Sequence, residues 1–574
     1  MHRRSFNPRL YLVFLFFALS LSFLFARLVY IQVFKSAHFR TFACEQHRIF
    51  TEIEPQRGAI FDRHLKELAV NTASYSIFAA NQPRPSTQGQ GRPTPAKKAE
   101  DEIASLLNLD KEGLSAKLNS DKGFVWLKRK VGPEVAKEIK DLALSGVGQL
   151  REYKRFYPNG PLASHVLGFT DIDNKGLEGV ELYCNSYLSG IKGWRIAERD
   201  AKRRELICWG YKSILPADGY DLVLTIDSVI QNIAERHLEK AAGKYKALSA
   251  TAIVMQPKTG EILALCNYPE YDLNYFGDYK ADTRRNLALT DIFEPGSSFK
   301  FVTAAAALEE EQVKPEDKFF CEKGQYRIGR RILHDYRPYG ELSFKEVIEH
   351  SSNIGTVKVA QRLGKETLYA YIRKFGFGSL TEIDLPGEVR GIVRSPKAWS
   401  KISITSVPIG QEIAVTPIQL IRAISCVANN GILVKPKLLK SVQDKEGRII
   451  KSFPTKNVRR VISPETARTL TEILAGVVEN GTGKRARVSG YKTCGKTGTA
   501  QKAKPTGGYY RRKYVSSFVG FVLKDEQPII SVLVVVNEPR GGHFGSTVCA
   551  PVFKKIATET LRYLEMSNEI RKTD

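Results

Sequence analysis

The chain has 574 residues, which is too long for one ordinary domain and predicts two or three. Its formal net charge of +26 indicates anionic surroundings, such as nucleic acid, a membrane surface or an acidic polymer. The sequence has no zinc-finger spacing, no RNP-like motif and no basic helix with heptads, so only charge favours nucleic acid and we expect no nucleic-acid partner.

The N-terminal segment predicts a membrane anchor. Three arginines precede an apolar run over residues 10–26, and a mostly apolar stretch over residues 28–34 follows Arg27. Together these stretches are long enough for the ~30 Å hydrocarbon core, and the Arg27 side chain can reach the headgroups. The positive residues before the run predict a cytoplasmic N-terminus, with the rest of the chain outside. A cleaved signal peptide is disfavoured, because Leu24 stands where a cut after Ala26 needs a small residue.

The region from residue 36 to residue 218 has the mixed pattern of an α+β domain with many loops. Residues 81–98 contain four prolines among small and polar residues, which predicts a mobile surface loop. Residues 99–118 have helical spacing with alternating charge, which predicts a helix. Eight cysteines are scattered along the chain without a C-x-x-C pair or a metal-ligand spacing, so we predict no metal site and assign no disulfide.

A change of pattern near residue 219 predicts the start of a second domain. A strand pattern from residue 219 ends at Asp227, which predicts a helix cap. Two β-rich runs joined by the turn at residues 256–260 predict a hairpin. We expect further elements at residues 297–310 (helix), 491–501, 514–522 and 529–536 (strands) and 550–564 (helix). These elements predict an α+β fold in which helices cover an antiparallel sheet.

The first of three short motifs, Ser297-Ser298-Phe299-Lys300, places a serine and a lysine one helical turn apart. A serine hydroxyl needs a base before it attacks a carbonyl, and lysine can serve if burial or neighbouring positive charge lowers its pKa. The motif is weak alone, since a capping serine with a solvated lysine has the same spacing. A serine–histidine pair with His165 or His350 is disfavoured, because no G-x-S-x-G surrounds Ser297.

Two later motifs supply the remaining polar groups of an acyl-transfer site. Ser351-Ser352-Asn353 follows a helical pattern and offers a hydroxyl and a carboxamide in a loop. Lys496-Thr497-Gly498-Thr499 lies in a strand pattern and offers a cation, two hydroxyls for a carboxylate and a glycine that lets a substrate backbone approach. The backbone N–H groups of Thr499 and Ser297 can face a developing oxyanion. The three motifs in this order predict a serine acyl-transfer enzyme that needs no metal and no cofactor.

The chain resembles the class B penicillin-binding proteins, monofunctional D,D-transpeptidases of peptidoglycan synthesis. The three motifs are those of penicillin-recognising serine enzymes, and further matches cover nearly the whole chain. They are found at residues 57–63, 176–178, 199–200, 285–288, 294–297, 410–420 and 537–539, of which the last two resemble the division-type branch. The chain departs from the family pattern at His64-Leu65, where the family usually has Asn-Gly, and at Gly545-Ser546, where it has paired glycines.

The resemblance implies four segments and a fold. We expect a cytoplasmic tip and transmembrane anchor helix over residues 1–35 and an elongated N-terminal pedestal of the dimerisation type over residues 36–218. The penicillin-binding transpeptidase fold should follow over residues 219–566, with a tail over residues 567–574. The protein is then expected in the inner membrane as a single-pass protein whose catalytic domain is periplasmic.

The resemblance also implies a role for each motif residue. Ser297 attacks the carbonyl between two terminal D-alanines of a stem peptide, Lys300 accepts its proton, and Ser351, linked to Lys496, passes a proton to the departing D-alanine. Asn353 holds Lys300 and the substrate amide. The substrate carboxylate is expected at Thr497, Gly498 and Thr499.

The implied partners are peptidoglycan stem peptides, β-lactams that acylate Ser297, a polytopic glycosyltransferase and other division proteins. Several alternatives remain open at this point. The protein could be an elongation-type transpeptidase, a D,D-carboxypeptidase or β-lactamase that uses water as the acceptor, or a non-catalytic β-lactam sensor or scaffold.

Overall fold

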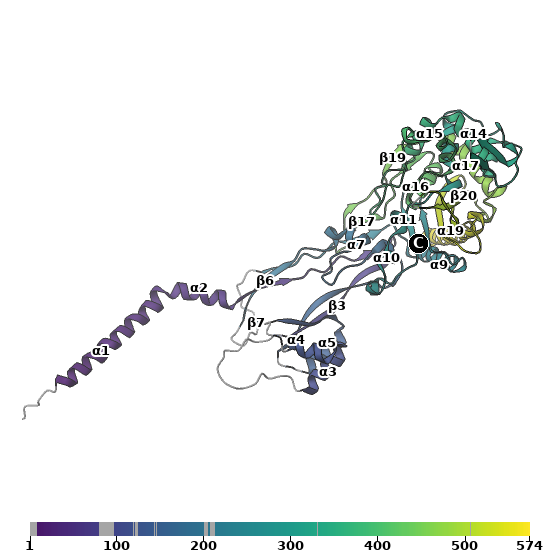
Figure 1. Ribbon diagram of the computed structural model, residues 1–574. Helices are drawn as coiled ribbons and strands as arrows, with labels where there is room; N and C mark the ends of the chain where they lie inside the picture. The colour runs from purple at the N-terminus through teal and green to yellow at the C-terminus, as the bar shows by residue number, and fades with distance from the viewer. Residues whose placement is uncertain are drawn as a thin grey trace, which may run out of the picture. The chain divides into compact units, whose positions relative to one another are not determined.

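A computed structural model describes residues 8–79, 97–118, 120, 124–142, 144, 146–199, 205–206, 213–329, 331–504 and 507–573 (Figure 1). The predicted loop at residues 81–98 lies outside the described residues, except for its last two positions, which begin a helix. The chain divides into two units, one of residues 1–55 with 190–218 and one of residues 56–189 with 219–574.

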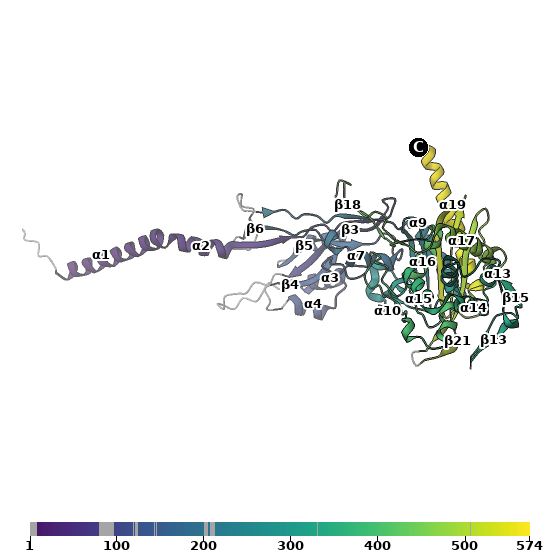
Figure 2. The same cartoon turned by 90° about the horizontal axis from the view of Figure 1, so that it is seen from above.

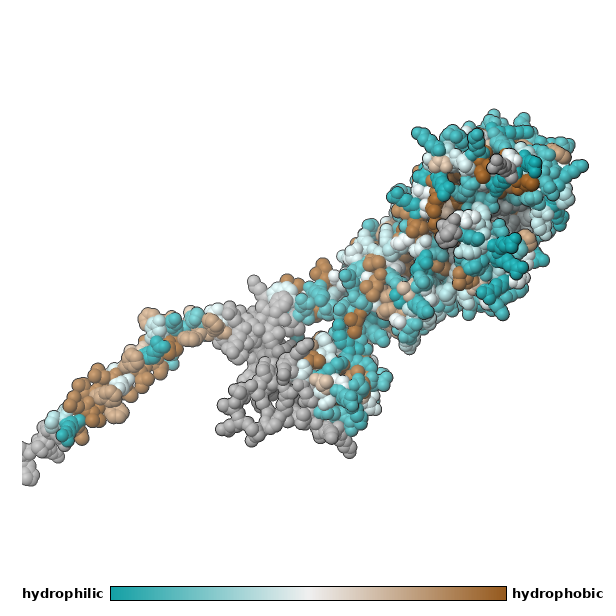
Figure 3. Space-filling view, viewed as in Figure 1, coloured by the Kyte–Doolittle hydropathy of each residue, from teal (hydrophilic) through white to brown (hydrophobic). Residues whose placement is uncertain are grey.

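The first unit carries the predicted anchor. The helices α1 (Pro8–Val29) and η1 (Tyr30–Phe34, a π-helix) form a 27-residue apolar span with no buried residue. At 1.5 Å per residue this span is about 40 Å long, more than the hydrocarbon core requires. Figure 3 shows the apolar surface along it. Within the described part of the chain, it is the one helix long and apolar enough to cross a membrane. The unit also contains α2 (Ser36–His47) and a four-stranded antiparallel sheet, with strands β1 (Arg48–Ile53), β6 (Gly193–Arg199), β7 (Glu205–Leu206) and β8 (Ser213–Ile214).

The second unit contains a seven-stranded sheet whose strands come from distant parts of the chain. Its order is β18-β17-β9-β2-β3-β4, with β5 also paired to β3. The strands are β2 (Ile60–Phe61), β3 (Glu67–Ala79), β4 (Val125–Val131), β5 (Val147–Phe156), β9 (Asp221–Leu224), β17 (Leu439–Gln443) and β18 (Ile449–Ser452). Because β9 pairs with β2 on one side and with β17 on the other, this sheet joins the predicted pedestal to the C-terminal half of the chain.

The helix that we predicted over residues 99–118 is two helices, so that prediction was wrong in detail. Helix α3 (Lys97–Leu107) ends before Asn108, which has a left-handed φ of 49°, and α4 (Lys111–Leu118) follows. Asparagine adopts this conformation more readily than most residues and ends helices for that reason. Both helices and α5 (Pro133–Asp141) pack on β3 and β4 through a separate apolar core that includes Ile77, Ile103 and Leu127.

Arg57, in the first of the segments that resemble the family, takes part in a buried ionic cluster. Glu181 is fully buried and accepts from Arg57 Nε at 2.7 Å and from Arg155 Nε at 2.6 Å. In the nearby turn that departs from the family pattern, Leu65 has a left-handed φ of 63°. The turn thus keeps a backbone shape that suits glycine while carrying a leucine.

A five-stranded antiparallel sheet with the order β11-β10-β22-β21-β20 forms the centre of the C-terminal region, as predicted. Its strands are β10 (Ser249–Met255), β11 (Ile262–Tyr268), β20 (Lys492–Ala503), β21 (Tyr509–Lys524) and β22 (Gln527–Asn537). Alternate residues of β22 enter different cores. Val532 and Val534 pack with α9 (Ser228–Lys244) and α19 (Ala550–Thr573), whereas Leu533 and Val535 join the larger core. Asp227 caps α9 by accepting from Val229 N and Ile230 N, as expected.

Helices α9 and α19 pack on one face of this sheet and α16 packs on the other, and the second unit contains further helices and small β-ribbons. The helices are α6 (Ser164–Leu167), α7 (Gly179–Tyr183), α8 (Asn185–Leu188), α9 (Ser228–Lys244), α10 (Ala281–Arg284), α11 (Leu287–Thr290), α12 (Lys300–Glu309), α13 (Phe344–Glu349), α14 (Asn353–Leu363), α15 (Lys365–Lys374), α16 (Pro417–Ala428), α17 (Pro464–Glu479), α18 (Gly545–Val548) and α19 (Ala550–Thr573). The ribbons are β12 (Lys318–Phe320) with β15 (Glu341–Ser343), β13 (Gln325–Ile328) with β14 (Arg331–His334), and β16 (Ile432–Val434) with β19 (Asn457–Arg460).

The end of the chain is more helical than we predicted. Helix α19 continues through residues 567–573, which we expected as a tail, and its last turns project from the domain (Figure 2). Six cysteines are buried thiols outside any disulfide in the described residues: Cys184, Cys266, Cys321, Cys426, Cys494 and Cys549. The side chains of Cys44 and Cys208 lie outside that set.

Candidate active site

Ser297 lies in a single 3-10 turn, η3 (Gly296–Phe299), at the N-terminus of α12. Its neighbours in the turn are buried while Ser297 itself is partly exposed. Ser298 anchors the turn by donating its hydroxyl to Pro295 O at 2.7 Å, and Phe299 packs on Phe377. The turn is therefore fixed by its buried neighbours and leaves the Ser297 hydroxyl accessible.

Lys300 is fully buried and makes three hydrogen bonds through its amine. Its Nζ donates to Ser351 O at 2.6 Å, to Ser351 Oγ at 3.2 Å and to Asn353 Oδ1 at 2.8 Å. Burial lowers the pKa of Lys300 to about 7, although the negative charge of Asp335 acts in the opposite direction. At neutral pH a large fraction of this amine is unprotonated, as a general base requires.

The Ser351-Ser352-Asn353 loop is held by Asp335, a residue that sequence reasoning missed. Asp335 Oδ2 accepts from Ser352 Oγ at 2.6 Å, and Oδ1 accepts from the backbone N–H groups of Asn353 at 2.5 Å and Ile354 at 3.1 Å. These are the orphan donors at the start of α14, so the carboxylate caps that helix together with Ser352. The sequence spacing carries no local signal for this contact, because Asp335 belongs to a loop after a different ribbon.

Lys496 lies on β20 and is also fully buried. Its Nζ has no hydrogen-bond partner among the described residues. Burial lowers the pKa of Lys496 well below its usual value, and the positive charge of Lys300 lowers it further. We expected Lys496 to be linked to Ser351, but no such hydrogen bond is present among the described side chains, and the Ser351 hydroxyl contacts Lys300 instead.

The two threonines of the third motif each have one hydrogen-bond partner. Thr497 Oγ1 lies 2.9 Å from Thr482 Oγ1, and Thr499 Oγ1 accepts from the backbone N–H of Gly545 at 3.0 Å. Because that bond uses an oxygen lone pair, the Thr499 hydroxyl keeps its proton for a ligand. Among the strands that the structure describes, β20 lies at the edge of its sheet and pairs with β21 alone, so the backbone groups along its other edge have no strand partner there.

Gly498 serves a contact that we did not predict. We expected its missing side chain to admit a substrate, but a Cβ there would lie 2.8 Å from Pro295 O and 2.2 Å from Ser517 Oγ. The glycine therefore lets the third motif pack directly against the turn that carries Ser297. This contact brings motifs about 200 residues apart into one site.

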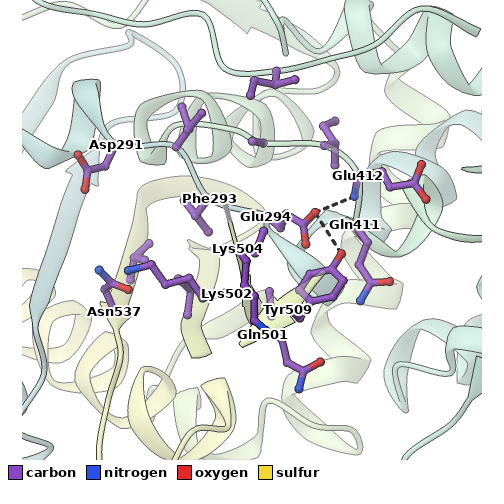
Figure 4. A pocket seen from close by; sticks show the side chains of 18 of the residues that line it. Asp291, Phe293, Glu294, Gln411, Glu412, Gln501, Lys502, Lys504, Tyr509 and Asn537 are labelled. Carbon is purple, nitrogen blue, oxygen red and sulfur yellow. Dashed lines mark hydrogen bonds between the residues drawn. The ribbon is translucent and has the colours of Figure 1, made fainter. Parts of the chain in front are cut away.

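A cavity of about 1080 Å³ begins beside this site and continues along β20 (Figure 4). Glu294, three residues before Ser297, lines it with Tyr509 and Glu412. Glu294 Oε1 accepts from Glu412 N at 2.9 Å and from Tyr509 Oη at 3.2 Å. Among the described residues, no cluster of three or more His, Cys, Asp or Glu side chains is placed to hold a metal ion.

Comparisons with known proteins agree with the fold and the motifs. Residues 250–558 match the penicillin binding protein transpeptidase domain, and residues 52–224 match the penicillin-binding protein dimerisation domain. The chain is 36% identical to stage V sporulation protein D of Bacillus subtilis over 99% of this chain and 88% of that protein. It is 32% identical to the peptidoglycan D,D-transpeptidase FtsI of Escherichia coli K12 over 96% of this chain and 90% of that one.

Solved structures show the same relationship. Penicillin binding protein 3 of Mycobacterium tuberculosis, solved as a complex with aztreonam, superposes with a TM-score of 0.69 at 27% identity, over 90% of this chain and 97% of that one. A peptidoglycan synthetase of Bifidobacterium adolescentis superposes with a TM-score of 0.71 at 27% identity, over the same shares. The chain therefore belongs to the penicillin-binding protein transpeptidase family, as a class B member with a dimerisation domain before its transpeptidase domain.

Proposed function

We propose that the protein is a serine D,D-transpeptidase that cross-links peptidoglycan stem peptides through an acyl-enzyme on Ser297. The observation that carries this proposal is the fully buried Lys300, which lies one turn after a partly exposed serine and is held by Ser351 and Asn353. Its lowered pKa supplies the base that a serine nucleophile requires. Relatives named as peptidoglycan D,D-transpeptidases support the substrate class.

The proposed reaction has two acyl transfers. In the first, Ser297 Oγ attacks the carbonyl of the penultimate D-alanine and its proton moves to Lys300 Nζ. The C–N bond to the terminal D-alanine then breaks, and the leaving amine takes a proton through Ser351. In the second, an amine of another stem peptide attacks the ester, loses a proton, and releases Ser297 as the free alcohol.

The remaining motif residues are proposed to hold the donor peptide. The hydroxyls of Thr497 and Thr499 suit its terminal carboxylate, since Thr499 keeps a free proton. The buried Lys496 amine has no partner among the described residues and can donate to the same carboxylate. The backbone amides of Ser297 and Thr499 suit the developing oxyanion. Gly498 contributes by keeping the strand against the nucleophile turn.

Mass spectrometry of penicillin-treated protein tests this proposal. We expect one penicilloyl adduct on the peptide that contains Ser297, formed as a stoichiometric burst with a chromogenic β-lactam. Fast repeated turnover would identify a β-lactamase, and D-alanine release without cross-link formation would identify a carboxypeptidase. Loss of growth complementation by Ser297→Ala would separate the enzyme from a non-catalytic sensor or scaffold.

We further propose that the protein acts in septal wall synthesis from the inner membrane. Helix α1 and η1 serve as a single anchor with a cytoplasmic N-terminus, which the arginines before the span support. Residues 410–420, which resemble the division-type branch, include Glu412, whose backbone binds Glu294 near the nucleophile. A polytopic glycosyltransferase and other division proteins are the proposed partners. Midcell accumulation of a fluorescent fusion is expected, and uniform lateral placement would favour an elongation role.

A further inference from the structure

Apolar and polar side chains both line the cavity near the nucleophile turn. Phe293, Ile413, Pro417 and Val535 are among the residues that line it. One wall is the hairpin formed by the end of β20 and the start of β21, and another is the segment around Glu412 (Figure 4). A cavity of about 1080 Å³ is large for a side chain alone, so it can take a side chain together with part of a peptide backbone.

Glu294 lines this cavity, and only one of its two carboxylate oxygens has a hydrogen-bond partner among the described residues. Its Oε1 accepts two hydrogen bonds, from Glu412 N and from Tyr509 Oη, which fix the orientation of the group. Its Oε2 is buried and has no hydrogen-bond partner among the described residues. Leaving such an oxygen unsatisfied costs free energy in the unliganded protein, and a donor that reaches it recovers that cost.

The charges around Glu294 favour a cationic donor. Burial raises the pKa of Glu294, and the negative charge of Glu412 raises it further, although the hydrogen bonds from Glu412 N and Tyr509 oppose this shift. No ion pair joins Glu294 to a cation in the described residues. Two cations that line the cavity are engaged elsewhere, because Lys502 pairs with Glu538 at 2.7 Å and Arg331 donates to Thr405, Ser406 and Gln411. Arg394 and Lys504 are exposed.

In the proposed binding mode, the third residue from the C-terminus of the donor peptide lies near this cavity. If the terminal carboxylate lies at Thr497 and Thr499 and the acylated carbonyl lies at Ser297, the peptide extends along the open edge of β20 toward Gln501. Two strand residues span about 7 Å, the length of one dipeptide step. Gln501 lines the cavity, so the residue before the acylated D-alanine is placed at its entrance.

We propose that this cavity holds the amine-bearing side chain of the donor stem peptide and that Glu294 Oε2 receives its ammonium group. The inference rests on the proposed transpeptidation: donor and acceptor are stem peptides of one polymer, so a donor also carries the side-chain amine that acceptors use. The apolar lining residues suit the methylene groups of such a side chain, and Glu294 suits its charged end. Glu294 is thus a specificity-determining residue for the donor.

Competition with a fluorescent penicillin tests the proposal on the full-length protein in detergent. The competitors are two N-acetylated tripeptides that end in D-Ala-D-Ala and begin with lysine or norleucine, which differ only in the amine. For each variant we compare the concentrations that halve the labelling rate, so a general loss of activity cancels in the ratio. We expect the wild-type protein to prefer the lysine peptide about tenfold, and Glu294→Gln to reduce this ratio to near one.

Asp291→Asn is the matched control. Its carboxylate lines the same cavity but is paired with Arg285, so the preference should remain about tenfold. If Glu294→Gln does not fold, acetylation of the lysine side chain of the peptide should abolish the preference in the wild-type protein. Absence of a preference in the wild type, or its retention in Glu294→Gln, would overturn the inference. If penicillin labels nothing, the proposed serine chemistry is wrong. Calorimetric titration with the lysine and norleucine peptides then tests separately whether the cavity prefers the amine.

Discussion

The Asp335 carboxylate accepts the backbone N–H of Asn353 at 2.5 Å and thereby fixes the residue whose side chain binds Lys300. A charged group that touches neither Ser297 nor its base thus determines where the base is held. This arrangement makes the second motif dependent on a loop that lies before α13 in the chain. A serine-x-asparagine motif without such a carboxylate would therefore not be sufficient to hold the lysine base in place.

Replacing Asp335 should therefore weaken both stability and acylation. Asp335→Ala removes three hydrogen bonds at the start of α14, and a loss of about 2 kcal/mol in the free energy of unfolding is expected. The rate of Ser297 acylation by penicillin should fall at least tenfold. Asp335→Asn keeps one acceptor oxygen, so its free energy of unfolding and its acylation rate should lie between those of the wild-type protein and Asp335→Ala. An unchanged acylation rate in Asp335→Ala would contradict the positioning role.

The pH dependence of acylation should report the protonation of Lys300. Its pKa is lowered to about 7 by burial, so the unprotonated base becomes more abundant as pH rises through 7. We expect the rate of penicillin acylation to increase over that range and to level off above it. Asp335, Cys321 and Lys496 act electrostatically on this amine or are acted on by it. Burial raises the pKa of Cys321 and lowers the pKa of Lys496 well below its usual value.

Lys300→Arg provides the test of that assignment. A guanidinium stays protonated throughout the accessible pH range, so it cannot accept the Ser297 proton. The acylation rate should drop by about 10²–10⁴ and lose its dependence on pH near neutrality. A variant that kept the wild-type pH profile would show that another group is the base.

The turn at Leu65 should be a site where glycine stabilises the protein. Leu65 has a φ of 63° and is largely exposed, so its side chain contributes little packing while its backbone is strained. Leu65→Gly removes a conformational cost of about 1–2 kcal/mol, part of which is returned by the greater freedom of glycine in the unfolded chain. A rise of roughly 0.5–1 kcal/mol in the free energy of unfolding is expected in thermal or denaturant melts. Leu68→Gly, at a buried position of β3, should instead destabilise it.

Local patterns predicted much of this protein because the chemistry of those segments is local. The Asp227 cap, the hairpin of β10 with β11 and the three strands β20, β21 and β22 each follow from residues close in sequence. Asp335 and Glu294 were missed because their roles come from contacts with Asn353 and Tyr509, which are brought to them only by the fold. The break at Asn108 was missed because the apolar spacing continues across it.

Substitution of Gly498 should distinguish a packing role of this glycine from a role in substrate contact. In Gly498→Ala the new methyl group would lie 2.2 Å from Ser517 Oγ and 2.8 Å from Pro295 O. The serine side chain can rotate away, but Pro295 O belongs to the backbone of the nucleophile turn and must move with it. We expect a loss of about 1–3 kcal/mol in the free energy of unfolding and a fall in the acylation rate with small and large β-lactams alike. Gly243→Ala is the control, since a Cβ there meets no atom within 4 Å and should leave acylation unchanged. A Gly498→Ala protein that melts like the wild type but acylates only small β-lactams would mean that the glycine makes room for substrate after all.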